Sequence, residues 1–327
     1  MHEDQTLPPK KLKEIEFPIN TASTTRKFLN ENQNKADDKL WYVIKHNMDY
    51  IQNMVEFLGK QPHQLRMVRL GSDILPLYTE DTWGSWFKSQ EVQQFTEQRL
   101  ATIGARAREL DCRLSMHPGQ FTVLASDTPD IVNNSIKEME YHTDIARMMG
   151  YGSQWQDFKI NVHISGRLGP DGIKAVLPRL SSECRNCMTI ENDEMKWGLE
   201  DSLELENDVA LVLDIHHHFI RSGEYIQTTD DRFKRVVDSW RGQRPVIHYS
   251  VSREDVLVDH DPNILPDMET LLAQGYKKTK LRAHSDYFWN HAVNNWAKQF
   301  YDHADIMCES KAKNLASFKF YKDFIDV

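Results

Sequence analysis

The sequence contains few cysteines and no long hydrophobic run. Its four cysteines are too few for a disulfide framework, and the CxxC motif of Cys184 and Cys187 has no second CxxC or histidine pair nearby to complete a zinc site. No apolar stretch reaches the ~18 residues that a membrane-spanning helix needs, and the first twenty residues lack a secretory signal. We therefore expect reduced cysteines, with a structural zinc as the alternative, and a cytoplasmic protein that does not enter a membrane.

An excess of positive charge is also lacking. The chain carries 40 Lys and Arg against 49 Asp and Glu, which gives a net charge of −9 with its 14 histidines counted as neutral. Nonspecific DNA binding relies on Lys and Arg side chains that neutralise phosphates. A nucleic-acid site on this chain therefore requires a local basic patch or positive charge from bound metal.

No Gly/Ser-rich linker, low-complexity segment or internal repeat divides the chain. Short apolar runs instead alternate with amphipathic, helix-like stretches such as residues 37–60 and 130–150. The strand-like runs are residues 66–71, 112–118, 159–165, 187–193, 210–217, 245–252 and 305–311. This alternation predicts an α/β fold with parallel strands, in the form of a (β/α)8 barrel of the TIM type that occupies residues 1–327 as a single domain.

The first strand of such a barrel is not recognisable. A closed barrel of this type has eight strands, but only seven runs are visible and residues 1–36 offer only the weak segment EIEFPI. We predict that the first strand is missing or degraded and that residues 1–20 are weakly ordered or a remnant. A missing strand would leave an open seam with unpaired edges. The chain would then be unstable, inactive or a fragment that begins at an internal Met.

Residues able to bind metal recur where the runs end. In a parallel barrel the carboxyl ends of all strands meet at one face, where the chemistry of this fold takes place. Histidines mixed with carboxylates are ligands for zinc, manganese or iron rather than calcium. Such a large set suits two or three ions that together clamp a phosphodiester. The candidates are Asp73, His117, His163, Glu191, Asp214, His216, His217, His248, His284 and Glu309.

Each of these residues also has an ordinary interpretation. A single histidine at a strand end is commonly a hydrogen-bonded core or rim residue. Glu191 can cap the following helix, and the three histidines 216–218 can form a solvated loop. The repetition of polar residues at successive strand ends favours a shared metal site over these separate explanations.

Eight motifs follow one another along the chain: RMVRLGSDILP, HPGQF, NVHISG, TIENDE, LDIHHH, IHYS, RAHSDY and CESKAKNLA. They resemble the successive motifs of UV damage endonucleases, relatives of the endonuclease IV type among the metal-dependent barrels. The resemblance runs from about Ile19 to Phe320 and is weakest before Arg66. It implies a DNA repair endonuclease that nicks UV-damaged double-stranded DNA 5′ of cyclobutane pyrimidine dimers and six-four photoproducts. It also implies a monomer with two to three divalent ions, usually Mn²⁺, with Zn²⁺ or Mg²⁺ as alternatives.

The resemblance assigns roles to single residues. Glu191, His248 and Glu309 would be catalytic, and Glu191 and Glu309 would bridge or orient the ions. Of the three adjacent histidines it selects His217, which leaves His216 and His218 beside the site, for example ordering Asp214. Water on the ions would attack the phosphorus in line, leaving a 3′-hydroxyl and a 5′-phosphate. The implied metal ligands are Asp73, His117, His163, Glu191, Asp214, His217, His248, His284 and Glu309.

Gln120 and Phe121 correspond to a wedge that enters the DNA beside the lesion in relatives, where Tyr is common at the second position. A flat apolar ring suits the space left by an extruded base. The alternative is that Phe121 packs beneath its own loop. The aromatic residues 287–289 either line the groove or belong to the core, and we favour the core for Trp289. Candidate phosphate contacts are Arg167, Arg253, Lys277, Lys278 and Lys280.

Two features depart from the family pattern. Some relatives carry a carboxylated lysine two residues before the histidine of the seventh strand, where this chain has Val246. The opening strand of the family is also not found before the segment PINTAS. The competing interpretations are a metal-dependent sugar isomerase or epimerase on the same barrel, and a non-catalytic relative that binds damaged DNA. Nine ligand positions and the wedge motif favour the nuclease.

Overall fold

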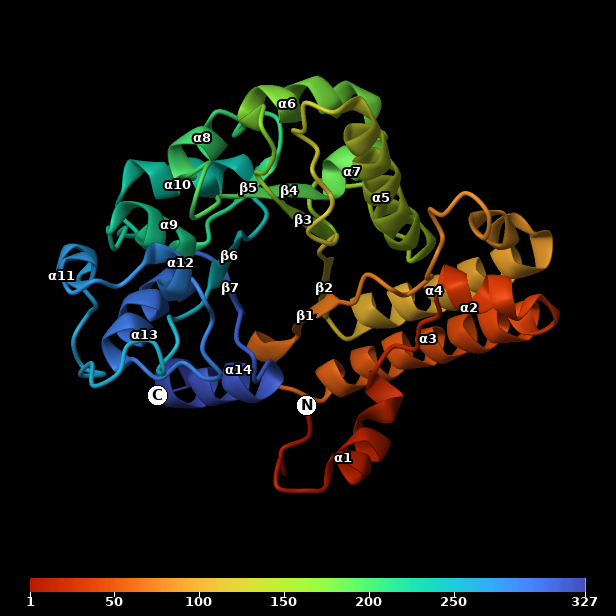
Figure 1. The fold of residues 1–327 in the computed structure, drawn as a ribbon, viewed down its shortest axis with the longest axis horizontal. Helices are drawn as coiled ribbons and strands as arrows, with labels where there is room; N and C mark the ends of the chain where they lie inside the picture. The colour runs from red at the N-terminus through yellow and green to blue at the C-terminus, as the bar shows by residue number, and fades with distance from the viewer. Residues whose placement is uncertain (327) are drawn as a thin grey trace.

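The structure, a computed structural model, describes residues 1–326. Short strands form its centre and helices surround them (Figure 1). The strands are β1 (Met67–Leu70), β2 (Arg113–Met116), β3 (Lys159–His163), β4 (Met188–Glu191), β5 (Ala210–Val212), β6 (Val246–Tyr249) and β7 (Asp305–Cys308). The α-helices are α1 (Pro9–Glu16), α2 (Arg26–Glu31), α3 (Ala36–Gly59), α4 (Gln90–Glu109), α5 (Pro129–Met148), α6 (Gly169–Val176), α7 (Ser182–Cys187), α8 (Leu199–Leu203), α9 (Ile215–Ser222), α10 (Asp231–Ser239), α11 (Met268–Ala273), α12 (Lys278–Leu281), α13 (His291–Lys298) and α14 (Asn314–Phe320).

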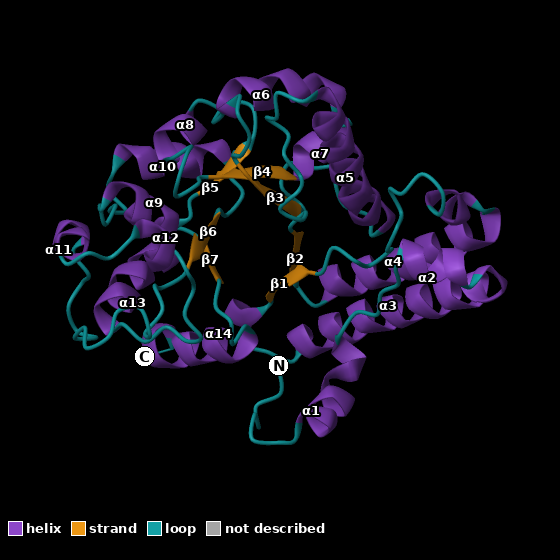
Figure 2. Cartoon of the chain, in the orientation of Figure 1, coloured by secondary structure: helices purple, strands orange, loops and turns teal. Residues whose placement is uncertain are grey.

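The strands follow one another in chain order around the centre (Figure 2). Strands β1 to β5 form one parallel sheet, and β6 and β7 form a second parallel pair. A parallel bridge between Asp214 and His248 connects the two sheets. Each predicted strand run contains an observed strand, and the predicted helices 37–60 and 130–150 correspond to α3 and α5. The prediction of a TIM-type α/β barrel is confirmed.

The barrel is open between β7 and β1. Within residues 1–326, β1 pairs only with β2 and β7 pairs only with β6. The segment EIEFPI does not fill this place, because it forms the end of α1 and a 3-10 turn, η1 (Phe17–Ile19). A cavity of about 490 Å³ lies at the seam and is lined by residues of both strands, among them Met67, Asp305 and Ile306. Side chains cross the opening in place of backbone hydrogen bonds, since Nη1 of Arg69 in β1 lies 2.6 Å from Oε1 of Glu309 after β7.

Successive strand residues face opposite sides of a sheet, so alternate positions point toward the barrel axis. The outward side chains join the helices in the main core, as the buried positions Ile44, Met48, Ile51 and Val55 of α3 do at helical spacing. A smaller apolar cluster combines side chains of β5 and β6, among them Val212 and Val246, with Trp240, which follows α10. Toward the carboxyl ends of the strands the inward positions become polar, and the candidate site lies there.

The four cysteines are free, as predicted, and Cys184 and Cys187 are buried. Burial raises the pKa of Cys184 to about 12, which disfavours the thiolate that metal binding requires. Within residues 1–326 no cysteine belongs to a group of potential metal ligands. Among the described helices, none has the length and apolar character that a membrane crossing demands.

Candidate metal centre

The candidate ligands meet because parallel strands end at one rim. His163 and Glu191 are the last residues of β3 and β4 and lie opposite each other in register. His117 follows β2 by one position, and Asp214 lies two positions beyond β5. His248 in β6 is bridged to Asp214. The chain thus gathers side chains from five strands at one end of the barrel.

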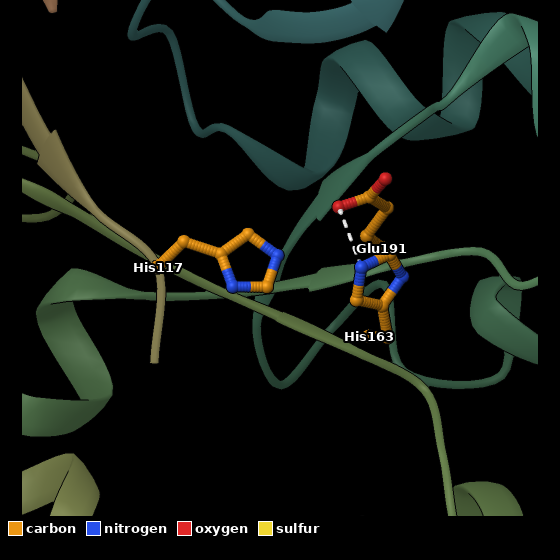
Figure 3. A group of neighbouring side chains, drawn as sticks. All are labelled: His117, His163 and Glu191. Carbon is orange, nitrogen blue, oxygen red and sulfur yellow. Dashed lines mark ion pairs between the residues drawn. The ribbon is translucent and has the colours of Figure 1, made fainter. Parts of the chain in front are cut away.

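One group of potential ligands consists of His117, His163 and Glu191, whose ligand atoms all lie within 4.8 Å of one another. The two imidazole rings are 5.1 Å apart between centroids. Nε2 of His163 lies 3.9 Å from Oε2 of Glu191. Figure 3 shows His117 approaching His163 and Glu191 from the opposite side, so that the three groups face a common space.

A second group consists of Glu191, Asp214 and His248, again with ligand atoms within 4.8 Å of one another. Nδ1 of His248 lies 3.2 Å from Oε2 of Glu191 and 3.4 Å from Oε1 of Glu309. Nδ1 of His217 lies 3.5 Å from Oε1 of Glu191 and 3.6 Å from Oδ2 of Asp214. Glu191 belongs to both groups and therefore occupies the centre of the cluster.

The three adjacent histidines separate because a helix begins at Asp214. Oδ1 of Asp214 accepts a hydrogen bond of 2.7 Å from the backbone N–H of His217, which caps the amino end of α9. His217 thereby turns toward Glu191. His216 faces His284, with ring centroids 6.3 Å apart, and Nε2 of His218 lies 3.1 Å from Oε2 of Glu224.

Asn192 is the residue that fixes the backbone of Asp214. Its Oδ1 accepts from the Asp214 N–H at 2.8 Å, and its Nδ2 donates to the Asp214 carbonyl at 3.0 Å. Within residues 1–326 no hydrogen bond joins the side chains of His216 and His218 to the carboxylate of Asp214. The ordering role considered for these two histidines therefore belongs to Asn192.

The other three predicted ligands, Asp73, His284 and Glu309, differ in their contacts with this cluster. Asp73 is exposed in the loop after β1, and among the described residues it joins neither ligand group. Its carbonyl accepts from Nδ2 of Asn47 at 3.0 Å. His284 is half-buried beside His216, and burial lowers its pKa although the charge of Glu309 opposes this shift. Glu309 contacts His248 directly and is held by Arg69.

The predicted wedge residues project from the loop that follows His117. Gln120 is exposed, and 85% of Phe121 is accessible to solvent. Phe121 therefore does not pack beneath its loop.

The second aromatic cluster belongs largely to the core. Phe288 is buried and stacks on Tyr249 with ring centroids 4.9 Å apart. Partly buried Trp289 donates a hydrogen bond of 2.8 Å to the Ser252 carbonyl. Two of the candidate phosphate contacts, Arg167 and Arg253, form ion pairs with Asp127 and Asp255.

Sequence reasoning missed several polar side chains next to the ligands. Nδ2 of Asn161 donates to Oε2 of Glu191. Nζ of Lys159 lies 2.9 Å from Nε2 of His248. The signal was present in KINVH, where alternation of polar and apolar residues puts Lys159, Asn161 and His163 on one face of β3.

A further carboxylate, Glu194, was also missed. Its Oε2 lies 3.8 Å from Nε2 of His217, and its Oε1 accepts from Nη1 of Arg282 at 2.7 Å. Glu194 stands only three residues beyond Glu191 in the motif TIENDE, but nothing in that spacing reveals its contact with α9.

The electrostatics of the site are set by burial and by close opposite charges. Burial raises the pKa of Asp214 to about 7, although the charge of His217 opposes the shift. Burial opposes protonation of His217, but Asp214 and Glu191 outweigh it and raise its pKa to about 9. For Glu191 the penalty of burial is overcome by His163 and His248, which hold its pKa well below the usual range.

Three buried ligand atoms lack a hydrogen-bond partner among the described residues. Oε1 of Glu191, Oδ2 of Asp214 and Nδ1 of His248 make no hydrogen bond within residues 1–326. Such atoms are costly to bury unless something binds them. Carboxylate oxygens and an imidazole nitrogen form a mixed donor set that suits a divalent transition-metal ion. The residues present therefore fit a divalent cation.

Comparisons with known proteins identify the family of this chain. The family described as UV-endonuclease UvdE matches residues 10–327. The UV DNA damage endonuclease of Bacillus cereus (strain G9842) is 27% identical over 315 residues, covering 92% of this chain and 88% of that protein. The enzyme of the same name from Bacillus thuringiensis subsp. konkukian (strain 97-27) is 26% identical over 321 residues, covering 95% and 90%.

A solved structure shows the same fold. The crystal structure of SacUVDE superimposes with a TM-score of 0.68 at 24% identity and covers 92% of this chain and 91% of its own. The family match extends over almost the whole sequence and confirms the family that the motifs predicted. This chain belongs to the UV-endonuclease UvdE family.

Proposed function

We propose that this protein is a metal-dependent endodeoxyribonuclease that nicks UV-damaged double-stranded DNA immediately 5′ of cyclobutane pyrimidine dimers and six-four photoproducts. Membership of the family supports a UV-damage repair endonuclease. The observation that carries the metal dependence is the set of unbonded, buried atoms on Glu191, Asp214 and His248. A sugar isomerase on the same barrel has no comparable support from the family match.

We further propose that two to three divalent ions bind, with Mn²⁺ preferred over Zn²⁺ and Mg²⁺. Support comes from the two ligand groups, which share Glu191. A carboxylate has two oxygens and can hold one ion with each. The mixed nitrogen and oxygen donors are consistent with manganese. His217, His284 and Glu309 surround these groups and offer further ligand atoms.

Because the chain has a net negative charge, much of the attraction for DNA phosphates must come from the site itself. Bound divalent ions would supply positive charge to the scissile phosphate and an ionised water near neutral pH. Glu191 and Asp214 provide the negative charge that retains the ions, and His248 directs Nδ1 toward the same space. Arg69 holds Glu309 at the rim and adds a cation beside the site.

Recognition of the lesion is assigned to the exposed loop after His117. Phe121 is free to enter a duplex, because most of its surface is exposed. Extrusion of bases costs a few kcal/mol and less where a photoproduct has weakened stacking and pairing. An apolar ring beside the lesion would fill the space that the extruded bases leave.

The test uses supercoiled plasmid, UV-irradiated or untreated, incubated with the full chain and Mn²⁺. We expect nicking of the irradiated plasmid only, and its loss when a chelator removes the ions. A duplex with a single defined photoproduct then maps the cut, which we expect immediately 5′ of the lesion. Equal nicking of both plasmids, or retardation of irradiated DNA without cutting, would contradict the proposal.

A further inference from the structure

Lys159 is a buried basic residue that the proposed chemistry does not use. It is the first residue of β3, and only 3% of its surface is exposed. Its side chain points inward on the same face as Asn161 and His163 and reaches β6, where Nζ lies 2.9 Å from Nε2 of His248. Strands β3 and β6 are not neighbours in the barrel, so the contact crosses the interior.

Lys159 is the group that holds the imidazole of His248 at one of its two nitrogens. The other nitrogen, Nδ1, faces Glu191 and Glu309 at 3.2 and 3.4 Å but makes no hydrogen bond within residues 1–326. The torsion that rotates an imidazole ring is broad, so packing alone orients the ring weakly. Metal-binding histidines are generally fixed by a partner that accepts the N–H of the nitrogen that does not bind the ion. The uncharged amine of Lys159 can accept from Nε2 in this way, which leaves Nδ1 without a proton and able to bind.

We propose that Lys159 is the positioning residue for His248 and keeps its Nδ1 directed at the space between Glu191, Asp214 and Glu309. The inference rests on the proposed function, since it takes His248 as a metal ligand. Val246 lies two residues before His248 on the same face of β6, but it belongs to the apolar cluster and offers no polar atom. The long side chain of Lys159 supplies the contact from another strand.

Arg113 offers a control, because it is a basic residue that begins strand β2 as Lys159 begins the neighbouring strand β3. Its Nη1 lies 2.6 Å from Oδ2 of Asp305, and its Nη2 donates to the Arg244 carbonyl at 2.7 Å. Among the described residues it contacts no candidate ligand. Substitution by methionine removes a basic group from the start of a strand in both cases, but only Lys159→Met removes a contact to His248.

The experiment measures metal binding apart from DNA cleavage. Wild type, Lys159→Met and Arg113→Met are stripped of metal, titrated with Mn²⁺ by calorimetry, and loaded with Co²⁺ for visible absorption spectra. We expect Lys159→Met to bind Mn²⁺ about 10- to 100-fold more weakly, the usual effect of removing a partner of a metal-binding histidine. Its Co²⁺ spectrum should change as well. Arg113→Met should match wild type in both measurements.

Thermal unfolding in the presence of a chelator separates positioning from a structural role. The melting temperature of Lys159→Met should not fall, because an apolar chain of similar length replaces a buried amine. A wild type that binds no divalent ion would refute the proposed function. If wild type binds ions, an unchanged Mn²⁺ affinity and Co²⁺ spectrum in Lys159→Met would overturn the role of Lys159. A lower melting temperature without metal would overturn it too, since the lysine would then act on the fold.

Discussion

Replacing Glu191 with glutamine removes one negative charge from the point where the two ligand groups meet. The side chain is completely buried, so water does not screen the change. Glutamine has nearly the same shape, and its amide oxygen can still accept the hydrogen bond from Nδ2 of Asn161. We therefore expect the variant to fold and to lose metal affinity and nicking.

The size of the loss follows from the distances in the cluster. The ligand atoms of Glu191, Asp214 and His248 lie within 4.8 Å of one another. Two unit charges about 4 Å apart interact by about 4 kcal/mol at an effective dielectric constant of about 20. Since each 1.4 kcal/mol is about tenfold in affinity, removing this charge should weaken binding of a divalent ion by about a thousandfold or more.

The assay compares wild type, Glu191→Gln and Glu183→Gln on UV-irradiated plasmid with Mn²⁺. Glu183 is a matched control, because it is a partly exposed carboxylate on α7, the helix that precedes the same strand. Circular dichroism and melting curves verify that each variant folds. Near-normal nicking and Mn²⁺ affinity in a folded Glu191→Gln protein would refute the reasoning and remove Glu191 from the site.

Two further predictions concern the recognition loop and acid stability. Phe121→Ala should reduce nicking of irradiated DNA at limiting enzyme without lowering the melting temperature, because the ring is exposed. The control is Tyr42→Ala, which removes another exposed aromatic ring, on α3. Equal nicking activity of the two variants would exclude Phe121 as a wedge. Burial lowers the pKa of His142 from 6.5 to about 4. As the pH falls from 6.5 to 4, the imidazole is therefore protonated in the unfolded chain before it is protonated in the folded one. The free energy of unfolding should decrease over this pH range by up to about 3 kcal/mol. Urea unfolding at pH 7, 5.5 and 4.5 should show a shallower decline for His142→Gln than for wild type, and parallel curves would rule His142 out as the cause.

The sequence by itself determined the barrel and most of the rim. Short apolar runs that alternate with amphipathic stretches have one compact arrangement at this length, parallel strands covered by helices. Because parallel strands share their carboxyl end, a polar residue at the end of each run was enough to predict that His117, His163, Glu191 and Asp214 would come together. The lack of a recognisable first strand was also predicted, since no apolar run precedes residue 37 apart from EIEFPI, and residues 1–326 contain seven strands.

The tertiary structure alone decided which side chains touch. The cap of α9 at Asp214 accounts for the way His217, which the motif had already selected, lies beside Glu191, and the loop after β1 leaves Asp73 outside both ligand groups. The contacts of Lys159 with His248 and of Arg69 with Glu309 join strands far apart in the chain. Periodicity reports the face on which a residue lies, whereas the partner it meets across a barrel depends on the tilt, register and closure of all the strands together.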